Sequence, residues 1–189
     1  MGTDKALLAW SGETLLQRAI SIAREACSRV FICGPRSRYG GFGDIVEDLE
    51  AGRGPLSGIQ AALCTTQTDL NLILSVDLPL MTTEFLTWLL QEARSGEQMI
   101  TIPQVLGRLQ PLCAVYHRQM GQYVDQALAQ GEFKVTRLTS RVATRIIAEE
   151  EVHAAGFAPY ILTNLNTPEE YASLRQAGSP QSQAGASHE

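Results

Sequence analysis

One carboxylate in this chain stands where an apolar run ends and a proline turn begins. It is Asp77, in the segment SVDLP. Ligands of layered α/β proteins bind at the carboxyl ends of the strands, and a carboxylate placed there is a hard oxygen ligand suited to magnesium. Aspartate is also common in turns. Taken alone, Asp77 therefore fits a magnesium ligand and a turn residue about equally.

Two other segments contain groups that could contact an anion. The segment GPLSG at residues 54–58 precedes an apolar helical stretch, and its backbone N–H groups could approach an anionic ligand. Its simpler interpretation is helix initiation, with Ser57 as the N-cap. Lys5, in the segment GTDKALL, could neutralise a phosphate as a point charge. Its simpler interpretation is a solvated side chain, and for each segment alone the simpler interpretation is favoured.

The segment NLNTPEE at residues 164–170 predicts the start of a late helix. Thr167, Pro168 and Glu170 form a capping box, which explains these three residues structurally. The box leaves Asn164 and Asn166 unexplained, because they alternate on an extended approach to the helix. Paired amides at a helix mouth could bind a polar ligand, and they could equally form a turn.

These segments must be positioned by an alternation of strands and helices. Apolar, β-branched runs predict strands, and stretches with helical spacing predict helices between them. The expected strands span residues 29–34, 71–76, 98–103, 111–116 and 142–148, and the expected helices span 13–27, 57–66, 82–94, 118–130 and 167–176. The pattern predicts a layered α/β domain with a mostly parallel sheet.

Composition limits the classes of function. A chain of 189 residues suits one domain, and its net charge of -5 argues against a general nucleic-acid binder. The four cysteines form no CxxC pair, so they predict small buried thiols rather than a zinc or redox motif. The sequence contains neither a signal peptide pattern nor an apolar run long enough for a membrane span. We expect a cytoplasmic protein whose polar residues 178–189 form a disordered tail.

The order and spacing of these segments are more specific than any one of them. Together DKALL, the acidic pair Glu47-Asp48, GPLSG, VDLP, PLCAVY and NLNTPEE resemble the molybdenum cofactor guanylyltransferases, from residue 1 to about residue 174. GPLSG and residues 164–169 discriminate best. The resemblance implies a three-layer, Rossmann-like nucleotidyltransferase domain over residues 1–177. It also implies that molybdopterin's terminal phosphate is joined to the α-phosphate of GTP, with Mg²⁺ as cofactor and pyrophosphate as the leaving group.

The resemblance also implies residue roles. Lys5 matches a lysine that contacts the nucleotide phosphates, Asp77 a magnesium ligand, and Asp48 an acidic position linked to guanosine. Asn164 and Asn166 match asparagines on the pterin side. The residues matched to the loop near the base are Gly54, Pro55, Leu56 and Gly58. The implied partners, besides the two substrates, are cofactor-insertion proteins or recipient molybdoenzymes.

The chain departs from the family pattern at two places. Where the family has an asparagine after its second strand, this chain reads Cys33-Gly34-Pro35. The family opens with a strand and a loop of the type LAGGxSxRMGxDK, and Met1 to Lys5 match only the last five positions. We therefore expect this chain to be a poor enzyme, and we expect the intact gene to encode an in-frame extension ending in Arg before Met1.

Two alternatives remain at the level of sequence. One is another nucleotidyltransferase of the same fold, acting with CTP or on a cobinamide or sugar phosphate. The other is a truncated, inactive chain that only binds a partner. Nucleotide competition distinguishes the first alternative, and measurable GTP turnover excludes the second.

Overall fold

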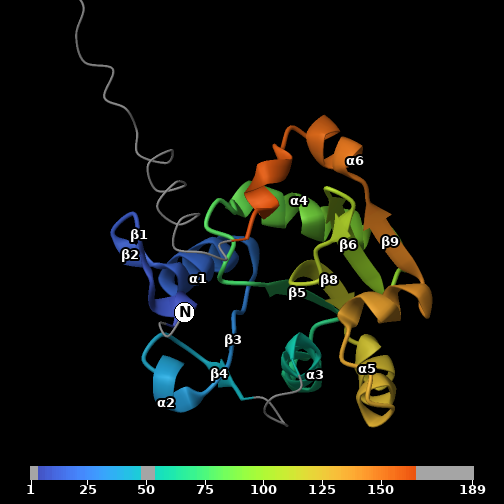
Figure 1. Ribbon diagram of the computed structural model, residues 1–189, viewed down its shortest axis with the longest axis horizontal. Coiled ribbons are helices and arrows are strands. Elements are labelled where there is room, and N and C mark those ends of the chain that lie inside the picture. The colour runs from blue at the N-terminus through green and yellow to red at the C-terminus, as the bar shows by residue number, and fades with distance from the viewer. Residues whose placement is uncertain (1–3, 48–53, 165–189) are drawn as a thin grey trace, which may run out of the picture.

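The computed structural model describes residues 4–47 and 54–164 as strands and helices in alternation (Figure 1). In chain order the elements are η1 (Lys5–Leu7), β1 (Ala9–Trp10), β2 (Glu13–Thr14), α1 (Leu15–Ala26), β3 (Ile32–Cys33), α2 (Arg36–Tyr39), β4 (Ile45–Val46), α3 (Pro55–Thr65), β5 (Leu70–Leu74), α4 (Thr83–Arg94), β6 (Ile100–Val105), β7 (Arg108–Leu109), β8 (Cys113–His117), α5 (Met120–Ala129), η2 (Val135–Ser140), β9 (Thr144–Ile147), α6 (Glu149–Ala154) and η3 (Pro159–Leu162).

Local sequence fixes the ends of the helices. Helix α1 begins after a capping box, in which the Thr14 hydroxyl accepts from the Gln17 N–H and the Gln17 side chain accepts from the Thr14 N–H. Helix α4 begins after Thr82, whose hydroxyl accepts from the Phe85 N–H. Helix α3 begins differently, because its N-cap is Gly54 at a φ of 69°. The interpretation of Ser57 as that N-cap is wrong: Ser57 lies in the first turn, and its hydroxyl donates to the Gly54 carbonyl at 3.0 Å.

The main sheet has β8 between β5 and β6, and β9 on the other edge of β6. Strand β9 runs parallel to β6, whereas β8 is antiparallel to both of its neighbours. The sheet was expected to be mostly parallel, but β8 pairs antiparallel with both β5 and β6. The reason is local: β6 ends in a tight turn at Leu106-Gly107, with φ of 51° and 70°, and β7 follows at once. A separate parallel pair joins β3 to β4.

Two hydrophobic cores lie on opposite faces of the sheet. Because side chains alternate along a strand, Leu70, Leu72 and Leu74 of β5 pack on one core while Ile73 packs on the other. The first core is built around α4, with part of α1, and the second around α3 and α5. The result is three layers, with the sheet between helices, as Figure 1 shows.

The elements expected from the sequence are present wherever the structure describes the chain, with shifted ends. The largest difference is at residues 29–34, where only Ile32–Cys33 pair as a strand. Residues 9–14 form a small hairpin, β1 with β2, that is separate from the main sheet. The expected helix at residues 167–176 and the expected tail lie outside the described residues.

Candidate functional site

Asp77 lies three residues beyond Leu74, the last residue of β5, and so at the strand's carboxyl end, as its sequence position predicts. Its Oδ1 atom is buried and has no hydrogen-bond partner. A buried carboxylate oxygen without a partner costs free energy, so such groups are rare and commonly mark a position where a ligand or ion binds. This observation favours a ligand-binding role for Asp77 over a role as a turn residue alone.

The turn after Asp77 is held in place by an arginine on α1. The Arg18 Nε donates to the Pro79 carbonyl at 2.6 Å, and its Nη2 donates to the Met81 carbonyl at 3.2 Å. Arg18 thereby joins α1 to the segment that carries Asp77. Sequence reasoning missed this residue. The signal was present, because Arg18 interrupts the helical spacing of the packed residues Leu15 and Ile22.

The start of α3 is the second part of the site. Gly54 and Pro55 are exposed there, and the N-cap has no side-chain hydrogen bond. Pro55 has no N–H, and the Ser57 N–H donates to the Gly54 carbonyl at 3.3 Å. The first-turn amide that could donate to an anion is therefore that of Leu56. Gly58 is half-buried in the second turn. The Leu56 side chain is fully buried in the core, so only its backbone could contact a nucleotide.

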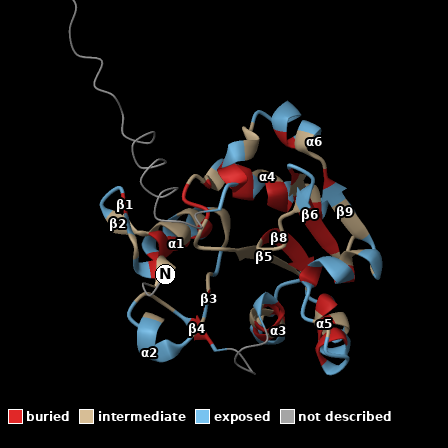
Figure 2. Ribbon diagram, in the orientation of Figure 1, coloured by how far each residue is buried: buried red, intermediate tan, exposed pale blue. Residues whose placement is uncertain are grey.

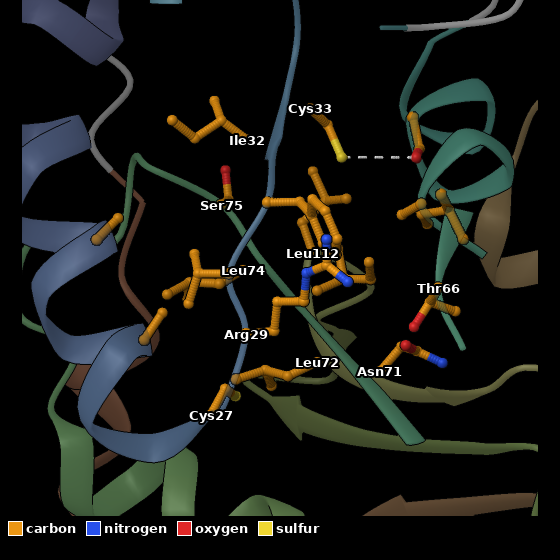
Figure 3. Close-up of a pocket in the computed structure, with 18 of the residues that line it drawn as sticks. Cys27, Arg29, Ile32, Cys33, Thr66, Asn71, Leu72, Leu74, Ser75 and Leu112 are labelled. Atoms are coloured by element: carbon orange, nitrogen blue, oxygen red, sulfur yellow. Dashed lines mark hydrogen bonds between the residues drawn. The ribbon is translucent and has the colours of Figure 1, made fainter. Parts of the chain in front are cut away.

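A cavity of about 930 Å³ connects these parts (Figure 3). Gly54, Pro55 and Gly58 line it from α3, and Ser75 and Val76 line it from the segment leading into Asp77. In Figure 3 the Cys33 thiol points toward α3, where its Sγ lies 3.8 Å from the Gly58 carbonyl oxygen. The cavity is thus lined by part of GPLSG and by Val76, the residue before Asp77, whereas Asp77 itself is not among its lining residues.

Lys5 opens η1, close to this end of the sheet. Asp4 accepts from the Ala6 N–H at 3.1 Å and from the Tyr39 hydroxyl at 2.8 Å. Burial, and then the hydrogen bond to Asp4, raise the pKa of Tyr39. Ala6 is buried in a cluster on which Val76 packs. The neighbours of Lys5 and Asp77 in the sequence, Ala6 and Val76, thus belong to the same hydrophobic cluster.

Among the described candidates, Lys5, Asp77 and Asn164 do not line this cavity. Asn164 is exposed, just after η3, and does not line the cavity. Asp48 and Asn166 lie outside the described residues. Glu47, the last described residue before that gap, accepts from the Arg36 N–H at 3.0 Å.

The residues present fit a magnesium ion shared with substrate. Within residues 4–47 and 54–164, no group of three or more acidic, histidine or cysteine side chains could hold a metal by itself. Magnesium is usually bound by one or two carboxylates together with substrate phosphates and water. A single carboxylate with an unpartnered buried oxygen is consistent with that mode of binding.

Comparison with known proteins decides the family. The model of the MobA-like NTP transferase domain matches residues 1–146. The chain belongs to this family. A probable molybdenum cofactor guanylyltransferase of Pelotomaculum thermopropionicum is 30% identical over 178 residues, which are 93% of this chain and 85% of that protein.

Solved structures agree with a MobA-like fold. The molybdopterin-guanine dinucleotide biosynthesis protein A of Archaeoglobus fulgidus superposes with a TM-score of 0.77 at 21% identity, covering 93% of this chain and 91% of that one. A 2-C-methyl-D-erythritol 4-phosphate cytidylyltransferase of Thermus thermophilus superposes with a TM-score of 0.67 at 14% identity, covering 92% of this chain and 93% of that one. Enzymes named for different nucleotides thus share the fold, so the fold alone leaves the nucleotide open. None of the described helices is long and apolar enough to cross a membrane.

Proposed function

We propose that this MobA-like protein transfers GMP from GTP to molybdopterin and releases pyrophosphate. The observation that carries the proposal is the buried, unpartnered Oδ1 of Asp77 at the end of β5. Val76, the residue before Asp77, lines a cavity that the start of α3 also lines. The resemblance to guanylyltransferases supports GTP and molybdopterin as the substrates. The polar, magnesium-dependent chemistry also suits a cytoplasmic enzyme.

The reaction is an in-line displacement at phosphorus. An oxygen of molybdopterin's terminal phosphate bonds to the α-phosphorus of GTP, and the bond from that phosphorus to the bridging oxygen of the β-phosphate breaks. Such a transfer depends on positioning and charge neutralisation rather than on a covalent enzyme intermediate. Asp77 would hold Mg²⁺, which supplies charge neutralisation at the phosphates.

The chain's own groups share the remaining work. The Leu56 N–H in the first turn of α3 donates to an anionic oxygen, and the helix dipole favours negative charge at that position. The Lys5 ammonium group neutralises part of the negative charge of the phosphates. Arg18 holds the turn after Asp77 through the Pro79 and Met81 carbonyls, and so restricts where the carboxylate can lie.

Nucleotide competition tests the substrate. GTP, CTP and ATP are titrated separately into the protein with MgCl₂, and binding is followed by calorimetry. We expect GTP to bind most tightly, because GPLSG and Asp48 match the family's guanosine positions. Tighter binding of CTP would favour a cytidylyltransferase of the same fold and would overturn the guanylyl assignment.

A further inference from the structure

The hairpin formed by β6 and β7 is held in place at both of its ends. In the turn, the Leu106 N–H donates to the Glu149 carboxylate at 2.6 Å. At the other end, the Gln110 N–H donates to the Pro103 carbonyl at 2.9 Å. Strands β5 and β6 are both antiparallel to β8, so they end at the same edge of the sheet. The two contacts therefore fix β7 at the edge where the segment carrying Asp77 begins.

Strand β7 lies on the side of β6 that faces β5. The Met99 carbonyl accepts from the His117 N–H, so it points to the edge of β6 that adjoins β8. Backbone groups of alternate residues point to the same neighbour in an antiparallel pair, and the Pro103 carbonyl therefore points to that edge too. Because β8 separates β6 from β5, β7 stands between the end of β6 and the segment that carries Asp77.

The Arg108 side chain, on β7, projects from the same face of the hairpin as Val105. The two residues lie directly opposite each other in the antiparallel pair, and opposite residues share a face of the sheet. Val105 is buried in the first core together with Leu78, the residue that follows Asp77. Arg108 thus projects from the face on which the segment carrying Asp77 packs.

The same face is bordered by η3. Leu162 of η3 is buried in the first core, and the exposed Asn164 follows it by two residues. Asp77 and Asn164 thus belong to segments that pack into one core with Val105. A cation that projects from the Val105 face of the hairpin can reach a ligand bound between these two segments.

The charge of Arg108 is not used within the part of the chain that the structure describes. Arg108 is exposed, and no residue of 4–47 or 54–164 forms an ion pair or a side-chain hydrogen bond with it. Its support is firm, because β7 leads into β8, in which four of five residues are buried, as Figure 2 shows. A guanidinium group held in this way is suited to bind two oxygens of one phosphate.

We propose that Arg108 binds the terminal phosphate of the acceptor, a phosphate monoester, and holds it against the nucleotide bound beside Asp77. The planar guanidinium donates to two of the phosphate oxygens, which leaves the third for attack on the α-phosphorus of GTP. Its positive charge also reduces the repulsion between the two phosphates. The identity of the acceptor rests on the proposed function, whereas the phosphate site rests on the position of Arg108.

The test compares Arg108→Gln and Arg108→Lys with the parent chain. Arg141→Gln is the matched control, because Arg141 is also exposed but precedes β9, at the opposite edge of the sheet. Inorganic phosphate is titrated into each protein by phosphorus NMR. Molybdopterin and its dephosphorylated form are then compared by equilibrium dialysis, and GTP binding is measured by calorimetry. Urea unfolding shows whether each variant keeps the stability of the parent.

We expect Arg108→Gln to bind inorganic phosphate about ten- to hundredfold more weakly than the parent, because charge-assisted hydrogen bonds are lost. Arg108→Lys should fall between the two, since lysine keeps the charge but not the two-oxygen geometry. The parent should prefer molybdopterin over its dephosphorylated form by a similar factor, and Arg108→Gln should lose that preference. GTP affinity and stability should stay within a few-fold and a few tenths of a molar of urea, respectively, of the parent values.

Three results would overturn the phosphate site: equal phosphate affinity in Arg108→Gln and the parent, an equal loss in Arg141→Gln, or a preference for molybdopterin that Arg108→Gln retains. Failure of the proposed function looks different. In that case phosphate binding still depends on Arg108, but the parent binds neither form of molybdopterin. That outcome would support the phosphate site and would refute molybdopterin as the acceptor.

Discussion

Replacing Asp77 by Ala should separate stability from function. Oδ1 of Asp77 is buried without a partner, and such an atom costs about 1–3 kcal/mol in the folded protein. Its removal relieves that cost but also loses the packing of the side chain, so the two effects oppose each other. Without metal, the free energy of unfolding should therefore stay within about 1 kcal/mol of the parent value, whereas most surrounding substitutions would lower it.

With metal and nucleotide the same substitution should be costly. At a ligand concentration one hundred times the Kd, binding stabilises the parent by about 2.7 kcal/mol, and the variant should lose most of that gain. Losing a metal ligand should also cost several kcal/mol of transition-state stabilisation. Because each 1.36 kcal/mol is tenfold in rate, turnover should fall by about two to three orders of magnitude.

The assay is denaturant unfolding with and without MgCl₂ and GTP, together with turnover. Asp44→Ala is the control, because Asp44 is also an aspartate but lies exposed at the start of β4. Two results would refute the reasoning. One is a loss of more than about 2 kcal/mol without metal, which would give Asp77 a structural role. The other is turnover within a few-fold of the parent.

Three further substitutions are informative. Arg18→Met removes the donors to Pro79 and Met81, so Mn²⁺ titration followed by EPR should show weaker metal binding, and unchanged affinity would limit Arg18 to stability. Replacing Asn164 and Asn166 by Ala should weaken molybdopterin use with little change in GTP affinity by calorimetry; an equal loss of GTP binding would contradict the pterin role. Arg145 and the Ala148 N–H lower the pKa of Glu151 from 4.5 to about 2. Glu151 therefore stabilises the fold above about pH 4.5, and this contribution is lost as pH falls toward 2. Urea unfolding of Glu151→Gln should show a flatter dependence on pH over that range, and a slope equal to the parent's would refute the linkage.

Much of the fold follows from local pattern. The apolar spacing of α1 and α4 and their hydroxyl caps locate both helices within a few residues. The direction of β8 could not be read from its composition, because an apolar run has the same appearance whichever way it pairs. It depends on the tight Leu106-Gly107 turn, which sends the chain straight back.

The site was only partly predictable, for a similar reason. The position of Asp77 after an apolar run was sufficient to predict its place at the sheet's edge. The unpartnered state of its oxygen depends on what surrounds it, which only the packed structure provides. The contacts from Arg18 cross more than sixty positions in sequence, and no local pattern specifies such a pair.

The transfer reaction itself is the most direct test of the proposed function. GTP labelled in its α-phosphate is mixed with molybdopterin, MgCl₂ and a molar excess of this protein, so that a single slow turnover is visible. We expect the label to appear in a pterin product as one pyrophosphate is released, and Asp77→Ala to slow the transfer by about two to three orders of magnitude. Label that stays in GTP or GMP, or more efficient transfer from labelled CTP, would contradict it.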